Sequence, residues 1–345
     1  MKKVLLYFVS VLLILGFTAC GSTHKALNPN EITGRIIIYT SMYEDVIAAV
    51  KRVTERQFPN CDIIFVYGGT GQIQSRITNE MATNRLGCDI LMVAEPAYAL
   101  ELREKEMLHP YRSPEGINLA YDHDPEGYWY PVRVSNMVLA YNPQIQDRNS
   151  LPNSFADFAY DTSVKGAISM SNPLTSGTTM SAVTALRDKY GYDYFDTLGR
   201  QNVVIESSAV AMTKLQAGDY KLIMVLEEVI LKERQEKGTP LEIIYPTDGT
   251  IIIPSPIMII NEKWSANKNI RAAETILDWF LGEEGQSAIV DGWMHSVRIN
   301  FSKIPFDSIP TSRIQANSIP VIWENNYRER DDIQARFEQY ITNRR

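Results

Sequence analysis

Three short segments combine glycine with hydroxyl residues in the way that anion-binding loops do. They are Gly68–Gly71, Ser176–Thr178 and Ser207–Ser208, and each comes directly before a stretch with helical periodicity. The first N–H groups of a helix lack internal partners, and the helix dipole places roughly half a positive charge there. Glycine lets a ligand approach the backbone, and hydroxyls add donors. We therefore predict ligand contacts at Gly69, Thr70, Gly71, Ser176, Gly177, Thr178 and Ser208.

Each of these segments also has an ordinary structural explanation. Gly-Gly-Thr-Gly is a common turn, and serine or threonine at the start of a helix is routine capping. What favours binding is their shared position, because each follows a predicted strand and the segments occur in both halves of the chain.

Three acidic residues also follow predicted strands. Glu95, Glu227 and Asp248 could accept hydrogen bonds from an ammonium group or from sugar hydroxyls. The alternative is that they are solvated caps and turn carboxylates, since Asp248-Gly249 is a strong turn signal. Arg133 could pair with a ligand anion or form a surface salt bridge.

Motifs for catalysis and for cofactors are missing from the sequence. It contains no Gly-x-Ser-x-Gly, no Walker loop and no complete Rossmann glycine pattern. His109, His123 and His295 have no nucleophile motif beside them, and the few Cys and His residues lack zinc-like spacing. We expect no catalytic residue, no cofactor and no metal ligand set.

Strands and helices alternate along the first part of the chain. Runs rich in β-branched residues at 35–40, 62–67 and 89–93 predict strands, separated by helical stripes. This order implies an α/β fold with a mostly parallel sheet covered by helices on both faces. Ligands bind outside the carboxyl ends of such strands. Ser41, Gly69–Gly71 and Glu95 would therefore meet in one crevice.

The same alternation returns in the second part, with strands predicted at 166–170, 202–205, 220–225 and 241–245. Two such units predict two lobes with a cleft between them, and the strand-like runs 130–141 and 251–260 would cross between the lobes and form a hinge. We expect lobe 1 to contain residues 33–133 and 253–345, and lobe 2 residues 134–252. A last helix over 330–342 would return to lobe 1.

Composition and charge indicate which kinds of ligand or macromolecule the protein could bind. The chain has 345 residues, with 34 Lys and Arg against 41 Asp and Glu and a formal net charge of -7. An acidic chain without a basic run argues against nucleic acid, because phosphate neutralisation needs clustered Lys and Arg. A small anion is still compatible with this composition, since backbone dipoles alone can hold one.

The N-terminal sequence predicts an export signal. Lys2 and Lys3 precede an apolar stretch over 4–17, which is too short to span a bilayer and suits a secretory signal. Residues 1–19 resemble a bacterial lipoprotein signal in which Cys20 is lipidated, with 20–32 as a tether; a plain secretory signal is the alternative. Exported Cys61 and Cys88 could form a disulfide or stay as two buried free thiols.

Several further segments match one protein family. They include residues 36–41 (Ile-Ile-Ile-Tyr-Thr-Ser), 88–91 (Cys-Asp-Ile-Leu), 110–115 (Pro-Tyr-Arg-Ser-Pro-Glu), 207–211 (Ser-Ser-Ala-Val-Ala) and 282–286 (Gly-Glu-Glu-Gly-Gln). With the glycine loops and the lipoprotein-like start, they make residues 33–342 resemble an extracellular solute-binding protein of an ABC importer, of the type 2 periplasmic-binding fold. The most similar branch holds receptors for iron(III), 2-aminoethylphosphonate and phosphorylated sugars.

The resemblance implies cleft contacts at Ser41, Gly69, Thr70, Gly71, Ser176, Gly177, Thr178, Ser208, Glu227 and Asp248. It also implies an exported, monomeric receptor that is lipid-anchored to a membrane and delivers its solute to an ABC permease. Iron receptors of this branch have adjacent tyrosines where this chain has Glu227-Glu228. We therefore expect a phosphonate or organic phosphate, with iron(III) or a ferric chelate as the alternative ligand. A secreted hydrolase and a structural lipoprotein are the alternatives of other classes.

Overall fold

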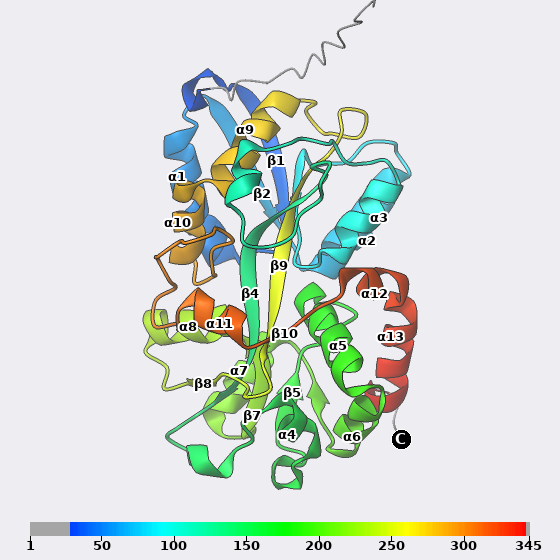
Figure 1. Cartoon of the computed structure of the whole chain (residues 1–345), viewed down its shortest axis with the longest axis vertical. Coiled ribbons are helices and arrows are strands. Elements are labelled where there is room, and N and C mark those ends of the chain that lie inside the picture. Colours follow the sequence, from blue (N-terminus) through cyan, green and yellow to red (C-terminus); the bar gives the residue numbers. More distant parts are fainter. Residues whose placement is uncertain (1–27, 343–345) are drawn as a thin grey trace, which may run out of the picture.

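A computed structural model describes residues 28–342 of the chain. Its strands form one twisted sheet that runs through both halves of the molecule (Figure 1). The strands are β1 (Gly34–Thr40), β2 (Cys61–Tyr67), β3 (Ile90–Met92), β4 (Tyr130–Tyr141), β5 (Ile168–Met170), β6 (Val204–Ile205), β7 (Leu222–Leu226), β8 (Glu242–Ile244), β9 (Thr250–Ile259) and β10 (Ser318–Ile319). Their order is β2-β1-β3-β9-β4-β7-β5-β6, with β8 paired to β4 and β10 to β9.

The first lobe is built on β1, β2 and β3, which are parallel as predicted. Alternate residues of these strands face opposite sides: Ile36 and Ile38 enter one buried core, and Tyr39 and Leu91 enter the other. The helices of this lobe are α1 (Glu44–Gln57), α2 (Thr70–Met81), α3 (Ala97–Glu104), α9 (Ile270–Leu281) and α10 (Glu283–Asp291). Apolar residues therefore bury both faces of the sheet.

The second lobe repeats the arrangement around β5, β6 and β7, which are again parallel. Its helices are α4 (Phe155–Tyr160), α5 (Gly177–Tyr190), α6 (Asp193–Arg200), α7 (Ser208–Ala217) and α8 (Glu227–Lys237). Phe155, Phe195 and Leu222 belong to its larger core. The prediction of two α/β units is confirmed.

Two long strands join the lobes. β4 and β9 pair antiparallel from Tyr130↔Ile257 to Met137↔Ile251, and both run between the upper and lower lobes in Figure 1. The pairing is interrupted by a register shift between Pro131 and Arg133. The two predicted crossings are thus present, and the irregularity lies beside the cleft.

The C-terminal segment lies elsewhere than we expected. It contains α11 (Thr311–Ala316), α12 (Trp323–Arg328), α13 (Arg330–Phe337) and a π-helical turn at Glu338–Thr342. Ile319, Ile333 and Phe337 pack into the core of the second lobe rather than the first. β10 fixes this placement by pairing with the start of β9 at Ser318↔Thr250. The amphipathic pattern predicted the helix but not the core that it covers.

The predicted signal peptide (1–19), Cys20 and the tether up to residue 27 lie outside the described residues. Between residues 28 and 342, no helix combines the length and apolar character needed to cross a membrane. Cys61 and Cys88 are buried and free, so the disulfide is not formed. Burial raises the pKa of the Cys88 thiol.

Candidate functional site

A cavity of about 510 Å³ lies between the two lobes, at the carboxyl ends of the parallel strands. Ser41 follows β1, Gly69 follows β2 and Ala94 follows β3, while Ser171, Glu206 and Leu226 stand at the ends of β5, β6 and β7. We call this the cleft cavity. Of the predicted contacts, it is lined by Ser41, Gly69, Thr70, Ser176, Gly177, Thr178 and Ser208.

Four helices begin at the wall of the cleft cavity. The first residues of α2, α5 and α7 line it, and so does Glu228 at the start of α8. Ser176 caps α5 by accepting from the Thr179 N–H at 3.2 Å, and Ser207 caps α7 by accepting from the Val210 N–H. Each helix N-terminus contributes roughly half a positive charge. The electrostatic potential of the wall therefore favours a negative group.

Arg133 adds a full positive charge to this wall. The residue is 3% exposed, and its Nη2 donates to Ser41 Oγ at 3.0 Å. The Nη1 atom contacts Met294 Sδ at 3.3 Å, while Nε has no hydrogen-bond partner. Within residues 28–342 no carboxylate forms an ion pair with Arg133. Burial lowers the pKa of Arg133 to about 10, which leaves it charged at neutral pH.

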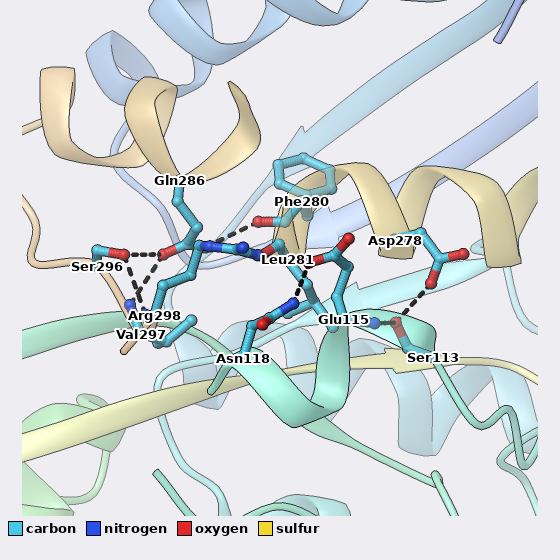
Figure 2. Close-up of polar contacts among 10 residues, drawn as sticks. All are labelled: Ser113, Glu115, Asn118, Asp278, Phe280, Leu281, Gln286, Ser296, Val297 and Arg298. Atoms are coloured by element: carbon cyan, nitrogen blue, oxygen red, sulfur yellow. Dashed lines mark hydrogen bonds and ion pairs between the residues drawn. The ribbon is translucent and has the colours of Figure 1, made fainter. Parts of the chain in front are cut away.

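Buried polar contacts hold the strand segment that carries Arg133. Gln286 of α10, fully buried, donates to the Val132 carbonyl at 2.7 Å, beside the register shift. Figure 2 shows the same amide bonded to the Phe280 carbonyl and to Ser296 and Val297. Gln286 closes the Gly-Glu-Glu-Gly-Gln motif. The motif therefore supports the site by fixing β4, without contacting the cavity.

Glu228 supplies the opposite charge. It is 4% exposed, lines the cavity and accepts a hydrogen bond from Ser135 Oγ at 2.7 Å. Burial raises the pKa of Glu228 to about 7, although Ser135 and Arg133 act against this shift. Tyr43 and Tyr67 also line the cavity. The cavity wall thus contains one buried guanidinium and four helix starts, together with a weakly acidic group that can accept a hydrogen bond.

The two lobes touch across the mouth of the cavity. The Gly71 N–H donates to the Thr175 carbonyl at 3.4 Å, and this occupies a backbone donor that we had assigned to the ligand. Gly177 lies so near Thr70 that an added Cβ would stand 2.9 Å from the Thr70 side chain. The structure therefore describes closed lobes, with Gly71 serving as an interlobe contact.

Comparison with known proteins gives the family. Residues 88–303, more than half of the chain, match the family described as bacterial extracellular solute-binding protein. The chain belongs to this family. Its members are exported proteins that bind small solutes and deliver them to ABC permeases. We found no match among curated proteins.

Solved structures agree on the fold of this solute-binding protein, the type 2 periplasmic-binding fold. Iron-bound HitA from Pseudomonas aeruginosa is 20% identical with a TM-score of 0.76, over 89% of this chain and 99% of that one. AfuA from Actinobacillus pleuropneumoniae, with fructose-6-phosphate bound, is 20% identical with a TM-score of 0.77, over 91% and 100%. A periplasmic thiamin binding protein is 13% identical with a TM-score of 0.72, over 90% and 98%. Proteins of this fold hold very different ligands, so the ligand must be argued from the cavity.

Glu227, expected in the cleft, lies outside the cavity. Its carboxylate accepts from Asn136 Nδ2 at 2.8 Å and Tyr245 Oη at 2.6 Å, and it contacts His295 Nε2 at 3.1 Å. Burial alone would raise the pKa of Glu227, but the bond to His295 and its other hydrogen bonds lower it overall. This carboxylate therefore joins α8 to β4 and to the His295 segment.

The His295 cluster contains a serine, a histidine and an acid, yet its geometry is not that of a hydrolase triad. Ser308 Oγ and Glu227 both contact His295 Nε2, whereas Nδ1 contacts Thr311 Oγ1 at 2.9 Å. A triad needs the acid and the nucleophile on different ring nitrogens. None of these residues lines the cleft cavity.

Glu95 and Asp248, which we predicted as ligand contacts, instead form contacts within the protein. Glu95 is fully buried and pairs with Arg330 of α13 at 3.0 Å; burial raises its pKa to about 7. Asp248 accepts from the N–H groups of Phe155 and Ala156 at 3.0 and 2.9 Å, and so stabilises the start of α4. Neither residue lines the cleft cavity.

These contacts lead to a prediction for Glu227→Gln. The amide NH2 would face either the Asn136 Nδ2 or the Tyr245 hydroxyl, each of which now donates to a carboxylate oxygen. We therefore expect the free energy of unfolding to fall by about 1–3 kcal/mol. Ligand affinity per folded molecule should change less than threefold. Urea unfolding and calorimetric titration measure the two quantities, with Glu228→Gln as the neighbouring control that alters affinity instead. Lost affinity at unchanged stability would place Glu227 in the binding site.

Proposed function

We propose that this protein is the substrate-binding component of an ABC importer and captures a small anionic solute, a phosphonate or an organic phosphate, in the cleft cavity. One observation carries the proposal: Arg133 is buried in the cavity wall without an ion-pair partner among the described residues. Glu228 acts on Arg133 without a direct ion pair, and its own pKa of about 7 leaves it partly neutral. A ligand anion would supply the direct ion pair that this buried charge lacks.

The surroundings of Arg133 support this anion. Ser41, Thr70, Thr178 and the starts of four helices line the same cavity. A hydrogen bond to a charged group contributes about 1.5–3 kcal/mol. Four or five of them, less the ordering costs, reach the ~8 kcal/mol of micromolar binding. A volume near 510 Å³ suits a small molecule.

Glu228 would receive the other end of the solute. As a carboxylate it accepts from an ammonium group, and in either protonation state it accepts from a hydroxyl. This pairing favours a ligand with an anionic end and a cationic or hydroxylated end.

Delivery completes the proposed role. The closed protein would dock on a membrane permease as a monomer, held near the membrane by a lipid on Cys20. No covalent chemistry on the solute is required, and Ser41, Thr70 and Thr178 would act only as hydrogen-bond donors.

Iron(III) is the second candidate ligand. Tyr43 and Tyr67 line the cavity beside Glu228, and phenolate and carboxylate oxygens suit a hard cation. The positive charge of Arg133 and of the helix starts disfavours a bare cation there. Within residues 28–342 no group of three His, Cys, Asp or Glu is placed to hold a metal ion.

A thermal-shift screen of phosphonates, organic phosphates and ferric chelates tests the proposal. A ligand at ~100 times its dissociation constant should add about 2.7 kcal/mol of stability. Thr178→Val should abolish the shift given by the best phosphonate or phosphate and leave the unliganded melting temperature nearly unchanged. A shift with ferric compounds alone would contradict the proposal.

Glu228 leads to a pH prediction. Its folded pKa of about 7 lies above its ordinary value of 4.5, so the folded state binds more protons between these values, and stability contributed by Glu228 falls as pH rises. Ionisation should meanwhile strengthen binding of 2-aminoethylphosphonate by up to about tenfold from pH 6 to 8, because the carboxylate then faces an ammonium group.

Calorimetric titration at both pH values measures this effect. Ethylphosphonate, which lacks the ammonium, should not gain affinity from the ionisation of Glu228. Glu228→Gln should reduce the pH effect on 2-aminoethylphosphonate binding relative to the parent protein; an unchanged pH effect in this variant would show that Glu228 does not face the cationic end.

A further inference from the structure

A second cavity of about 340 Å³ adjoins the cleft cavity. Tyr43, Ser208, Ala209 and Glu228 line both spaces, so the two cavities meet at these four residues. We call the second space the side cavity. It too lies between the lobes: α1 and the Gly292–Trp293 turn come from the first lobe, and α7 and α8 from the second.

The walls of the side cavity are largely apolar. Val46, Met212, Val229 and Trp293 line it, and the Trp293 indole is held by a 2.6 Å hydrogen bond from Nε1 to Gln235. Gly292 lets this turn approach α1, since a Cβ there would stand 2.7 Å from Val46. Methionine adapts its shape to different guests, and an indole offers a flat face.

The lysines of the side cavity already have ion-pair partners. Lys232 forms an ion pair with Asp45, and Lys237 pairs with Glu233 at 2.6 Å. These lysines therefore have direct ion-pair partners, which Arg133 in the cleft cavity lacks. The side cavity therefore has no unpaired lysine that would attract a second anionic group of the ligand.

We propose that the side cavity receives an apolar, preferably aromatic, substituent of the solute whose anionic group is held in the cleft cavity. This inference rests on the proposed function. Both lobes supply walls, so such a substituent contributes to binding only when the lobes are closed. A phosphonate or phosphate that carries an aryl or aralkyl group would then bind more tightly than the same compound with a methyl group in its place.

The test compares methylphosphonate with 2-phenylethylphosphonate by calorimetry. Burial of the phenyl group should make the second ligand bind at least tenfold more tightly. Thr213 lines the side cavity only and is exposed, so Thr213→Trp should fill the space without touching the cleft cavity. It should remove the advantage of the phenyl group and leave methylphosphonate within twofold. Val210→Trp, at an exposed α7 position that lines neither cavity, is the matched control.

The outcomes separate the two proposals. Equal affinity of the two ligands, or equal weakening of both by Thr213→Trp, overturns the side-cavity inference while the anion site stands. Failure of every phosphonate and phosphate to bind the unmodified protein overturns the proposed function itself. As a second readout, 4-nitrobenzylphosphonate should quench indole emission on binding, and Trp293→Phe should remove most of this quenching; unchanged quenching contradicts the assignment.

Discussion

Replacing Arg133 with methionine should weaken phosphonate or phosphate binding by at least 100-fold. Removing one partner of a buried, hydrogen-bonded charge pair typically costs about 2–5 kcal/mol, and Arg133 is the full positive charge in the cavity wall. The unliganded protein should keep or gain stability, because an apolar side chain replaces a buried charge without an ion-pair partner among the described residues. Calorimetric titration and urea unfolding measure the two effects.

Arg133→Lys is the graded control. It keeps the charge and loses the planar donor geometry, so its affinity should lie between those of the parent and the methionine variant. If the methionine variant bound phosphonates normally, Arg133 would be a structural charge and the cavity would need another anion partner.

Gly177→Ala should weaken binding of every ligand by tenfold or more. In the closed protein the added Cβ would stand 2.9 Å from Thr70 Cγ2 and Oγ1, which is closer than real Cβ contacts. When the lobes are apart, this steric clash is absent. The variant should therefore remain folded but fail to close fully. Small-angle scattering should show less compaction on ligand addition than in the parent protein.

Gly69→Ala is the matched control at the same mouth. A Cβ at Gly69 meets no other protein atom nearer than 3.7 Å, so the compaction seen by scattering should be nearly unchanged. Adding Thr70→Ala to Gly177→Ala removes both clashing atoms and should give a favourable coupling in a double-mutant cycle. Full affinity and compaction in Gly177→Ala would show that binding does not need this interlobe contact.

The sequence was sufficient to place the strand ends, and with them the cleft cavity. β-branched runs followed by glycine and hydroxyl residues predicted where β1, β2 and β5 stop and where α2, α5 and α7 begin. Strand direction then dictated that these ends meet, because parallel strands share one carboxyl edge. This is why Ser41, Thr70 and Thr178 line one space.

Which neighbouring residue faces the cavity could not be predicted in the same way. Successive residues on a helix point about 100° apart, so an uncertainty of one residue at the start of α8 exchanges Glu227 for Glu228. Asp248 caps a helix that begins 93 residues earlier, a contact set by the tertiary fold. Arg133 carries no local motif, and its orientation depends on the β4 irregularity that Gln286 holds.

The central claim is that the cleft cavity binds an anion through Arg133. Its most direct test is calorimetric titration of the purified protein with 2-aminoethylphosphonate, in the presence and absence of an equal concentration of iron(III) supplied as a weak chelate. We predict micromolar or tighter binding of the phosphonate that iron(III) does not diminish and that Arg133→Met removes. Heat with iron(III) and none with the phosphonate would contradict the claim.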